Sequence, residues 1–199
     1  MKKVLFIDRD GTLIIEPPDE QIDSLEKLEF LPGAITWLRK IAERSGFELV
    51  LVSNQDGLGT DSFPEETFWP AHNKMIRTLE NEGVKFSAEY IDKSFPHENK
   101  ATRKPGTGML TSFFSPDYDL KNSYVIGDRA TDMQLAVNMG CKGLLISTTL
   151  TTDLPNCIAL SSWEEIYKHL VEAPRKSEII RNTNETQISI KFNLVESEN

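Results

Sequence analysis

Cysteines are rare, basic residues are outnumbered and long apolar runs are missing from this sequence. Cys141 and Cys157 are the two cysteines in 199 residues. They fit neither a disulfide framework nor a metal site, so we expect reduced, mostly buried thiols in a cytoplasmic protein. Lysine and arginine total 22 against 31 aspartate and glutamate residues, a net charge of −9, which argues against nucleic-acid and membrane partners. The opening MKKVLFIDRD is too briefly apolar for a secretory signal, and no run reaches the ~20 residues of a membrane-spanning helix.

Apolar segments alternate with amphipathic ones, which predicts an α/β fold. We expect strands at 3–7, 47–52, 87–91, 122–126 and 143–147. We expect helices at 33–45, 64–82, 106–115, 130–139 and 162–172. Because the strands are apolar on both faces, the central sheet should be mostly parallel and covered by helices on both sides, in a Rossmann-like three-layer sandwich.

The segment FIDRDGTLI, residues 6–14, holds the most informative pair of side chains. Residues two apart in an extended chain point the same way, so Asp8 and Asp10 place two carboxylates together at a strand end. Carboxylates this close repel each other unless a cation lies beside them, which makes them candidates for a Mg²⁺ site. Taken alone, Asp10 and Gly11 fit a simple turn equally well.

Three later segments supply the groups that phosphate chemistry at a carboxylate requires. LVLVSNQDG ends an apolar run with Ser53, TRKPG carries Lys104, and YVIGDRATD ends another apolar run with Asp128. Singly, such residues fit a helix N-cap or a surface lysine. Together, each at the end of an apolar run, they would lie at the edge of the sheet where open α/β folds bind ligands. Their order resembles the haloacid-dehalogenase superfamily of phosphatases.

The resemblance implies a reaction and a metal. Asp8 would be the nucleophile that forms an aspartyl-phosphate, and Asp10 would be the general acid and base. Dehalogenases of the superfamily lack the second acid because a halide needs no proton, so Asp10 favours a phosphatase or a phosphotransferase. Asp8, Asp128 and the main-chain carbonyl of Asp10 would hold Mg²⁺.

The resemblance also implies a set of residues that bind the substrate. Ser53, the amide of Asn54 and Lys104 would bind the phosphate oxygens. Asp132 would orient Lys104 or a metal-bound water. Alternatively, Asp132 is simply an acid in the first turn of a helix, where the helix dipole favours a negative charge. Further candidates without an assigned role are Gln55, Arg103 and Arg129.

The intervals between these motifs leave no room for a folded cap domain. We therefore expect an open site whose selectivity comes from three loops, 14–31, 54–63 and 92–103. This arrangement resembles the capless branch of the superfamily, which includes histidinol-phosphate phosphatases and heptose-bisphosphate phosphatases.

Two stretches favour the first of these substrates. FIDRDGTLIIEPP and SNQDGLGTDSFP resemble the histidinol-phosphate phosphatase domain of a bifunctional histidine-biosynthesis enzyme. The resemblance implies hydrolysis of L-histidinol phosphate, and we take Glu16 as the candidate partner of its ammonium, or else a solvated flap residue. A heptose-bisphosphate phosphatase and a non-catalytic phosphate-binding or docking module remain the alternatives.

The C-terminal segment RNTNETQISIKFNL, residues 181–194, resembles the opening of imidazoleglycerol-phosphate dehydratase, the second domain of that bifunctional enzyme. We therefore expect a phosphatase domain at 1–173, a linker at 174–180 and a truncated dehydratase start at 181–199. The absent domain would then mediate oligomerisation. A strand without its sheet is unstable, so 178–199 should be disordered or paired with a neighbouring chain.

The sequence departs from its branch in the loop before Lys104. Relatives in that branch carry a structural zinc there on three cysteines and one histidine. Those positions hold Asp92, Ser94, Lys100 and Thr102 here. We predict that the zinc is absent and that Asp92 and Lys100 form a weaker crosslink in its place.

Overall fold

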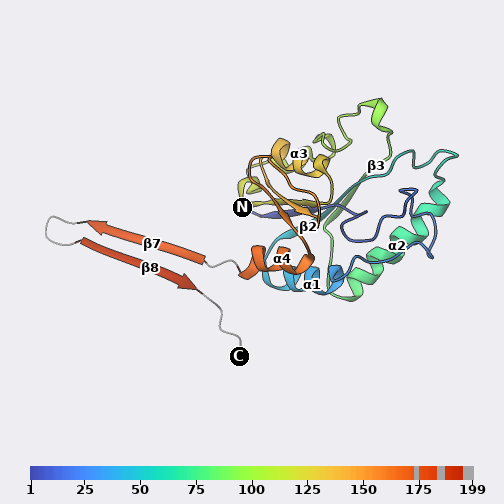
Figure 1. Cartoon of the computed structure of the whole chain (residues 1–199). Coiled ribbons are helices and arrows are strands. Elements are labelled where there is room, and N and C mark those ends of the chain that lie inside the picture. The colour runs from blue at the N-terminus through green and yellow to red at the C-terminus, as the bar shows by residue number, and fades with distance from the viewer. Residues whose placement is uncertain (173–174, 183–186, 195–199) are drawn as a thin grey trace.

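A six-stranded parallel sheet forms the centre of the protein (Figure 1). The computed structural model describes the backbone of residues 1–172, 175–182 and 187–194, and the side chains of 1–172. The strands lie in the order β3-β2-β1-β4-β5-β6, and every pairing is parallel. Their bounds are β1 Val4–Ile7, β2 Glu48–Asn54, β3 Ala88–Asp92, β4 Tyr124–Gly127, β5 Lys142–Ile146 and β6 Cys157–Leu160.

Helices cover both faces of this sheet, as predicted. The α-helices are α1 Ala34–Arg44, α2 Glu65–Asn81, α3 Ala130–Met139 and α4 Trp163–Tyr167. Shorter helical segments are η1 Pro96–Glu98, η2 Gly108–Phe114, η3 Leu120–Asn122 and η4 Lys168–Glu172. In Figure 1, α1 and α4 lie on one side of the sheet and α3 on the other.

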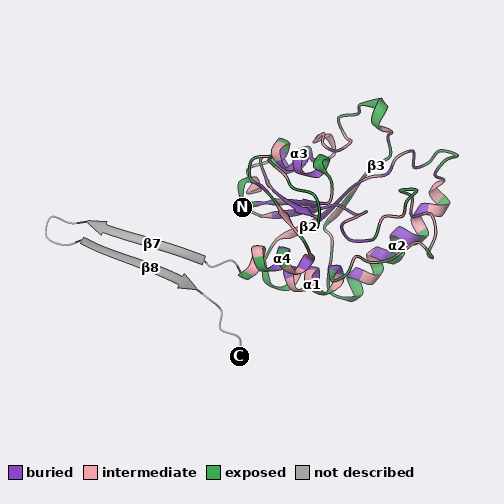
Figure 2. Ribbon diagram, in the orientation of Figure 1, coloured by how far each residue is buried: buried purple, intermediate pink, exposed green. Residues whose placement is uncertain are grey.

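Strand β1 shows how one sequence supplies two cores. Leu5 and Ile7 belong to the apolar cluster under α1, α2 and α4, whereas Val4 and Phe6 belong to the cluster under α3 and η2. All four side chains are fully buried, and the strands form the buried middle layer in Figure 2. The two-residue period of a strand therefore explains the three-layer sandwich.

The strand order fixes where a ligand can bind. The chain runs from β1 through β2 to β3 on one side, and β4 returns to the other side of β1. Parallel strands place their carboxyl ends at one edge, and ligands bind where the order reverses. The segments that follow β1, β2 and β4 therefore meet at this edge.

Within residues 1–172, three elements differ from the sequence prediction. Strand β6, Cys157–Leu160, was not expected, because a four-residue edge strand with one buried side chain has no apolar run to reveal it. The helix expected at 106–115 is the 3₁₀ helix η2, in a segment that opens with two glycines. The helix expected at 162–172 is α-helical through Tyr167 and continues as a π-helix.

The C-terminal segment forms an antiparallel pair, β7 Arg175–Asn182 with β8 Gln187–Leu194, in a sheet of its own (Figure 1). Residues 178–182 and 187–194 therefore pair within the chain, where we had expected disorder or pairing with a neighbouring chain. Residues 183–186 and 195–199 lie outside the described chain. Strand β7 was not predicted because its sequence, RKSEIIRN, is rich in charged residues. Most of this strand lies in the segment that we had assigned to a linker. The domain boundaries stay a prediction.

Candidate active site

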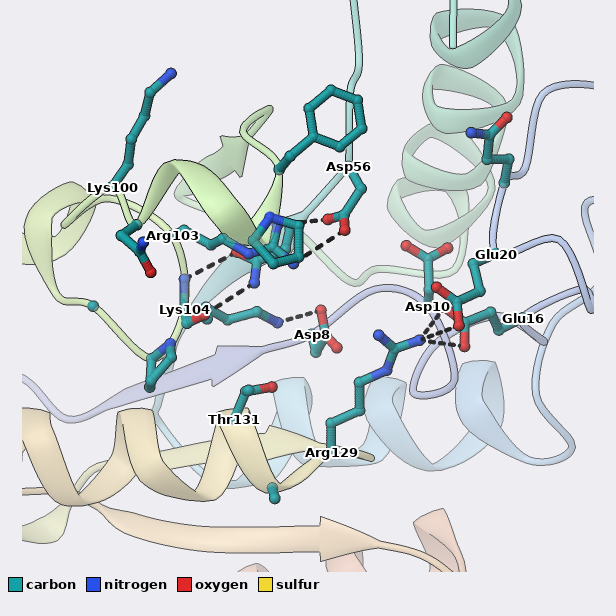
Figure 3. A pocket seen from close by; sticks show the side chains of 18 of the residues that line it. Asp8, Asp10, Glu16, Glu20, Asp56, Lys100, Arg103, Lys104, Arg129 and Thr131 are labelled. Atoms are coloured by element: carbon teal, nitrogen blue, oxygen red, sulfur yellow. Dashed lines mark hydrogen bonds and ion pairs between the residues drawn. The ribbon is translucent and has the colours of Figure 1, made fainter. Parts of the chain in front are cut away.

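A buried lysine lies between two carboxylates at the edge where the strands end, and Figure 3 shows its contact with the first of them, Asp8. Lys104 Nζ lies 2.6 Å from Asp8 Oδ1 and 2.8 Å from Asp132 Oδ1. The same ammonium donates to the carbonyl of Val52 at 3.0 Å. All three charged side chains are buried. Three motifs from distant parts of the sequence therefore meet at one cation, as predicted.

This burial shifts the protonation of the cluster. Burial raises the pKa of Asp8 well above its usual range, and the nearby carboxylate of Asp132 adds to the effect while Lys104 opposes it. Burial alone would lower the pKa of Lys104, but the two carboxylates outweigh burial and raise that pKa. Lys104 thus stays charged and compensates the carboxylate that is expected to act as nucleophile.

Next to the lysine, three carboxylates could share a cation. Oxygen atoms of Asp8, Asp128 and Asp132 lie within 4.8 Å of one another. Asp128 Oδ1 is buried and has no hydrogen-bond partner within residues 1–172, and burial together with Asp132 raises the pKa of Asp128 to about 6. A buried carboxylate oxygen without a donor, in a set of oxygen ligands, fits a hard divalent cation such as Mg²⁺.

Gly11 keeps this acidic site open. Its φ is +68°, and a Cβ atom at this position would overlap the Asp128 carboxylate. Glycine therefore meets two requirements here, a left-handed backbone and the close approach of the β1 loop to Asp128.

Asp10 is held by two donors beside the cluster. Arg9 NH1 donates to Asp10 Oδ1 at 2.8 Å, and Gln55 Nε2 donates to Asp10 Oδ2 at 2.6 Å. Gln55 Nε2 also lies 2.8 Å from Ser53 Oγ. Ser53 is fully buried and is not among the residues that line the pocket. Gln55 thus connects Ser53 to Asp10, an arrangement that the sequence did not reveal.

Asn54 connects β2 to the lysine loop. Its Oδ1 accepts from the backbone N–H of Lys104 at 3.0 Å, and its Nδ2 donates to the Lys104 carbonyl at 3.2 Å. The prediction concerned the Asn54 main-chain amide, so this role of the side chain was missed. A pair of bonds across 50 positions of sequence fixes the height of Lys104 above the sheet.

A pocket of about 830 Å³ opens above these residues. It is lined by parts of the three loops expected to confer selectivity, and by the start of α3. Two ion pairs stand at its rim (Figure 3). Arg129 NH2 lies 2.7 and 2.6 Å from the two Glu16 oxygens, and Arg103 binds Asp56. We expected the Glu16 carboxylate to bind a substrate ammonium; in the structure it forms an ion pair with Arg129.

Known proteins resemble both the sequence and this geometry. A HAD-hydrolase-like family model matches residues 101–159. Histidine biosynthesis bifunctional protein HisB of Spirosoma linguale is 54% identical over 98% of this chain and 55% of its own length. The protein of the same name from Bacteroides fragilis is 51% identical over 97% of this chain and 54% of its own. The chain thus spans about half the length of these curated relatives.

Solved structures agree on the fold. D,D-heptose 1,7-bisphosphate phosphatase from B. bronchiseptica, complexed with magnesium and phosphate, superposes with a TM-score of 0.74 at 26% identity, covering 85% of this chain and 98% of that one. The phosphatase of that name from Burkholderia thailandensis has a TM-score of 0.58 at 21% identity over 84% and 97%.

The chain has the fold of the haloacid-dehalogenase hydrolases. Its cysteines are both buried. No helix of the described residues is long and apolar enough to cross a membrane.

The loop before Lys104 differs from our prediction. Asp92 is buried and accepts hydrogen bonds from the Ser94 backbone, the Ser94 hydroxyl and the Thr102 hydroxyl. Burial alone would raise the pKa of Asp92, but these donors outweigh burial and lower it. Lys100 binds Glu98 at 3.0 Å instead. The expected Asp92–Lys100 crosslink was therefore wrong, because two short hydroxyl side chains reach Asp92 within its buried site. We call Asp92, Ser94 and Thr102 the loop clasp.

Proposed function

We propose that this chain hydrolyses L-histidinol phosphate to L-histidinol and phosphate, as the phosphatase portion of a longer histidine-biosynthesis protein. The observation that carries the proposal is the buried Lys104 between Asp8 and Asp132, beside a second acid that faces the pocket. Similarity to proteins named for histidine biosynthesis supports the choice of substrate.

The reaction would proceed in two displacements. In the first, the Asp8 carboxylate attacks phosphorus, the ester P–O bond breaks, and Asp10 gives its proton to the departing alkoxide oxygen. L-histidinol leaves, and Asp8 carries the phosphoryl group. In the second, Asp10 takes a proton from a water that attacks phosphorus, which releases phosphate and restores the Asp8 carboxylate.

Lys104 would act electrostatically in both steps. Its ammonium contacts the nucleophile and is held by Asp132 and the Val52 carbonyl. It is therefore preorganised to compensate charge on the transferring phosphoryl group. Asp8, Asp128 and the main-chain carbonyl of Asp10 would hold Mg²⁺, which supplies a Lewis acid to the phosphate oxygens when bound. Ser53 and the Asn54 amide remain proposed phosphate ligands.

The rim of the pocket would recognise the rest of the substrate. Glu16 and Glu20 line it with carboxylates that suit an ammonium. Arg129 binds Glu16 and lies 3.9 Å from Glu20. A substrate ammonium would therefore compete with Arg129 for these carboxylates. The Arg129 side chain, once released from Glu16, would turn toward the phosphate.

A heptose bisphosphate is the second candidate substrate. Lys100, Arg103 and Arg129 all line the pocket, so a second phosphate group would find cations there. The structural similarity to a heptose-bisphosphate phosphatase supports this alternative. A non-catalytic phosphate-binding module is disfavoured because it has no chemical need for Asp10.

Substrate preference tests the proposal. Phosphate release from L-histidinol phosphate and from D,D-heptose 1,7-bisphosphate would be measured with Mg²⁺ present. We expect kcat/KM to favour histidinol phosphate by a factor above about 100, or roughly 2.7 kcal/mol of transition-state discrimination. The opposite preference would show that the substrate is a heptose bisphosphate and leave the proposed phosphatase mechanism in place. No phosphate release from either compound would support the non-catalytic phosphate-binding module.

A further inference from the structure

Arg9 is a fully buried cation between the two acids of the first motif. Its side chain is 0% exposed, and it is not among the residues that line the pocket. Its NH1 group lies 2.8 and 3.2 Å from the two oxygens of Asp10. Its Cζ atom lies 4.8 Å from the centre of the Phe68 ring in α2. Arg9 therefore supports Asp10 from the side away from the substrate.

No carboxylate other than Asp10 pairs with Arg9 in the described part of the chain. Arg9 Nε and NH2 have no hydrogen-bond partner within residues 1–172. Glu89 binds His72 Nε2 at 2.7 Å, and the His72 ring stacks on Phe68. Burying a guanidinium without several partners is costly, and an apolar side chain would fill the same space at lower cost. The interaction with Asp10 is thus the gain that justifies a cation here.

The two donors on Asp10 define its orientation. Arg9 donates to Oδ1 and Gln55 to Oδ2, so the carboxyl plane is fixed at both oxygens. Asp10 is kept out of the cluster in which Asp8, Asp128 and Asp132 approach one another. Asp10 Oδ2 accepts from both Gln55 and Arg9, whereas Oδ1 accepts from Arg9 and retains a second lone pair, on which a proton for the leaving group can reside.

We propose that Arg9 is a positioning residue for proton transfer by Asp10. This inference rests on the proposed function. When Asp10 gives its proton to the departing oxygen, it becomes a carboxylate and the buried guanidinium gains its counter-charge. Arg9 therefore stabilises the charge that Asp10 acquires as the ester P–O bond breaks. In the second displacement the same guanidinium holds the carboxylate that takes the proton from water.

The prediction concerns the leaving group, because an alkoxide needs a proton and a nitrophenolate does not. Arg9→Met keeps the volume and removes the charge. We expect it to lower kcat for an alkyl phosphate by roughly 10²-fold or more, the usual contribution of general acid catalysis. The kcat/KM value for p-nitrophenyl phosphate, which reports the steps through its first displacement, should change much less than that for the alkyl phosphate. Arg9→Lys should recover part of the alkyl-phosphate rate, and Phe68→Leu should affect both esters alike.

A double mutant separates positioning from packing. In an Asp10→Asn background, Arg9→Met should cause no further loss on the alkyl phosphate. An equal loss on both esters, or a full additional loss in the double mutant, would overturn the proposal. If Arg9→Met does not fold, the ratio of the two esters in Arg9→Lys decides the question in the same way. Asp8→Asn should abolish both activities; if it does not, the proposed function fails, independently of Arg9.

Discussion

Two sets of ion pairs face the same pocket and differ in depth. At its floor, the Lys104 side chain is 4% exposed and lies between two carboxylates. At its rim, the Arg129 side chain is 46% exposed and its partner Glu16 24% exposed. Removing one member of a buried pair costs about 3–5 kcal/mol, whereas an exposed pair contributes about 0–1 kcal/mol. The floor is therefore fixed, and the rim can exchange partners with a substrate at little cost.

The strongest test of the floor is Asp8→Asn. This change removes the nucleophile and keeps the size of the side chain, so turnover should fall by roughly 10⁴-fold or more, as for other nucleophiles of covalent catalysis. Phosphate release from L-histidinol phosphate measures it. Asp19→Asn, at the rim of the pocket, is the matched control and should retain activity. Unchanged turnover in Asp8→Asn would contradict the mechanism.

Lys104→Met tests the charge balance of the floor. It leaves the buried carboxylates of Asp8 and Asp132 without their cation, so we expect kcat to fall about 10²–10³-fold, in the range for loss of one preorganised charge. The free energy of unfolding should also drop by about 3–5 kcal/mol. Denaturant titration and steady-state kinetics check both effects. Lys100→Met, which removes an exposed lysine, should leave stability nearly unchanged.

Asp128→Asn tests the acidic site by its response to pH. Burial raises the pKa of Asp128 from 3.8 to about 6 in the folded protein. The folded state then binds more protons than the unfolded state between these values, so stability falls as pH rises through this range. Above pH 6, and without Mg²⁺, the asparagine variant should have the higher Tm.

The metal gives the complementary readout for the same variant. Added Mg²⁺ should raise the Tm of the parent protein and have much less effect on Asp128→Asn. Asp153→Asn, a change at an exposed position, is the control and should follow the parent. An equal Mg²⁺ response in Asp128→Asn would remove Asp128 from the proposed metal site.

The loop clasp should respond more weakly. Thr102→Val keeps the shape of the side chain and removes one hydrogen bond to the buried Asp92 carboxylate. We expect a loss of about 1–3 kcal/mol in the free energy of unfolding, because the acceptor is charged and buried. Thermal unfolding measures this, with the exposed Thr149→Val as the control. Equal stability of both variants would show that the clasp does not anchor the loop.

Parallel topology explains why much of the floor could be predicted. Apolar runs in the sequence identify the strands, and the carboxyl ends of parallel strands meet at one edge of the sheet. The residues that follow these strands can therefore be expected to lie together, as Asp8, Lys104, Asp128 and Asp132 do. The sequence alone identified these residues. Their catalytic roles remain predictions that the variants above test.

Contacts between side chains on different loops could not be predicted in the same way. Asn54 binding the Lys104 backbone, and Arg129 binding Glu16 across 113 positions, depend on loop conformation rather than on periodicity. The clasp was missed because Lys100 was the obvious cation for Asp92, yet hydroxyl groups serve that carboxylate. Edge strand β6 was missed because it carries one buried residue in four.

The most direct measurement compares one floor variant and one rim variant on two esters. Steady-state kcat/KM would be determined for Lys104→Met and Glu16→Gln with L-histidinol phosphate and with p-nitrophenyl phosphate. The account predicts that Lys104→Met lowers both values by the same large factor, since it acts on the phosphoryl group, and that Glu16→Gln lowers the value for histidinol phosphate alone, since p-nitrophenyl phosphate has no ammonium. Equal losses on both esters in Glu16→Gln, or a loss confined to histidinol phosphate in Lys104→Met, would contradict the division between floor and rim.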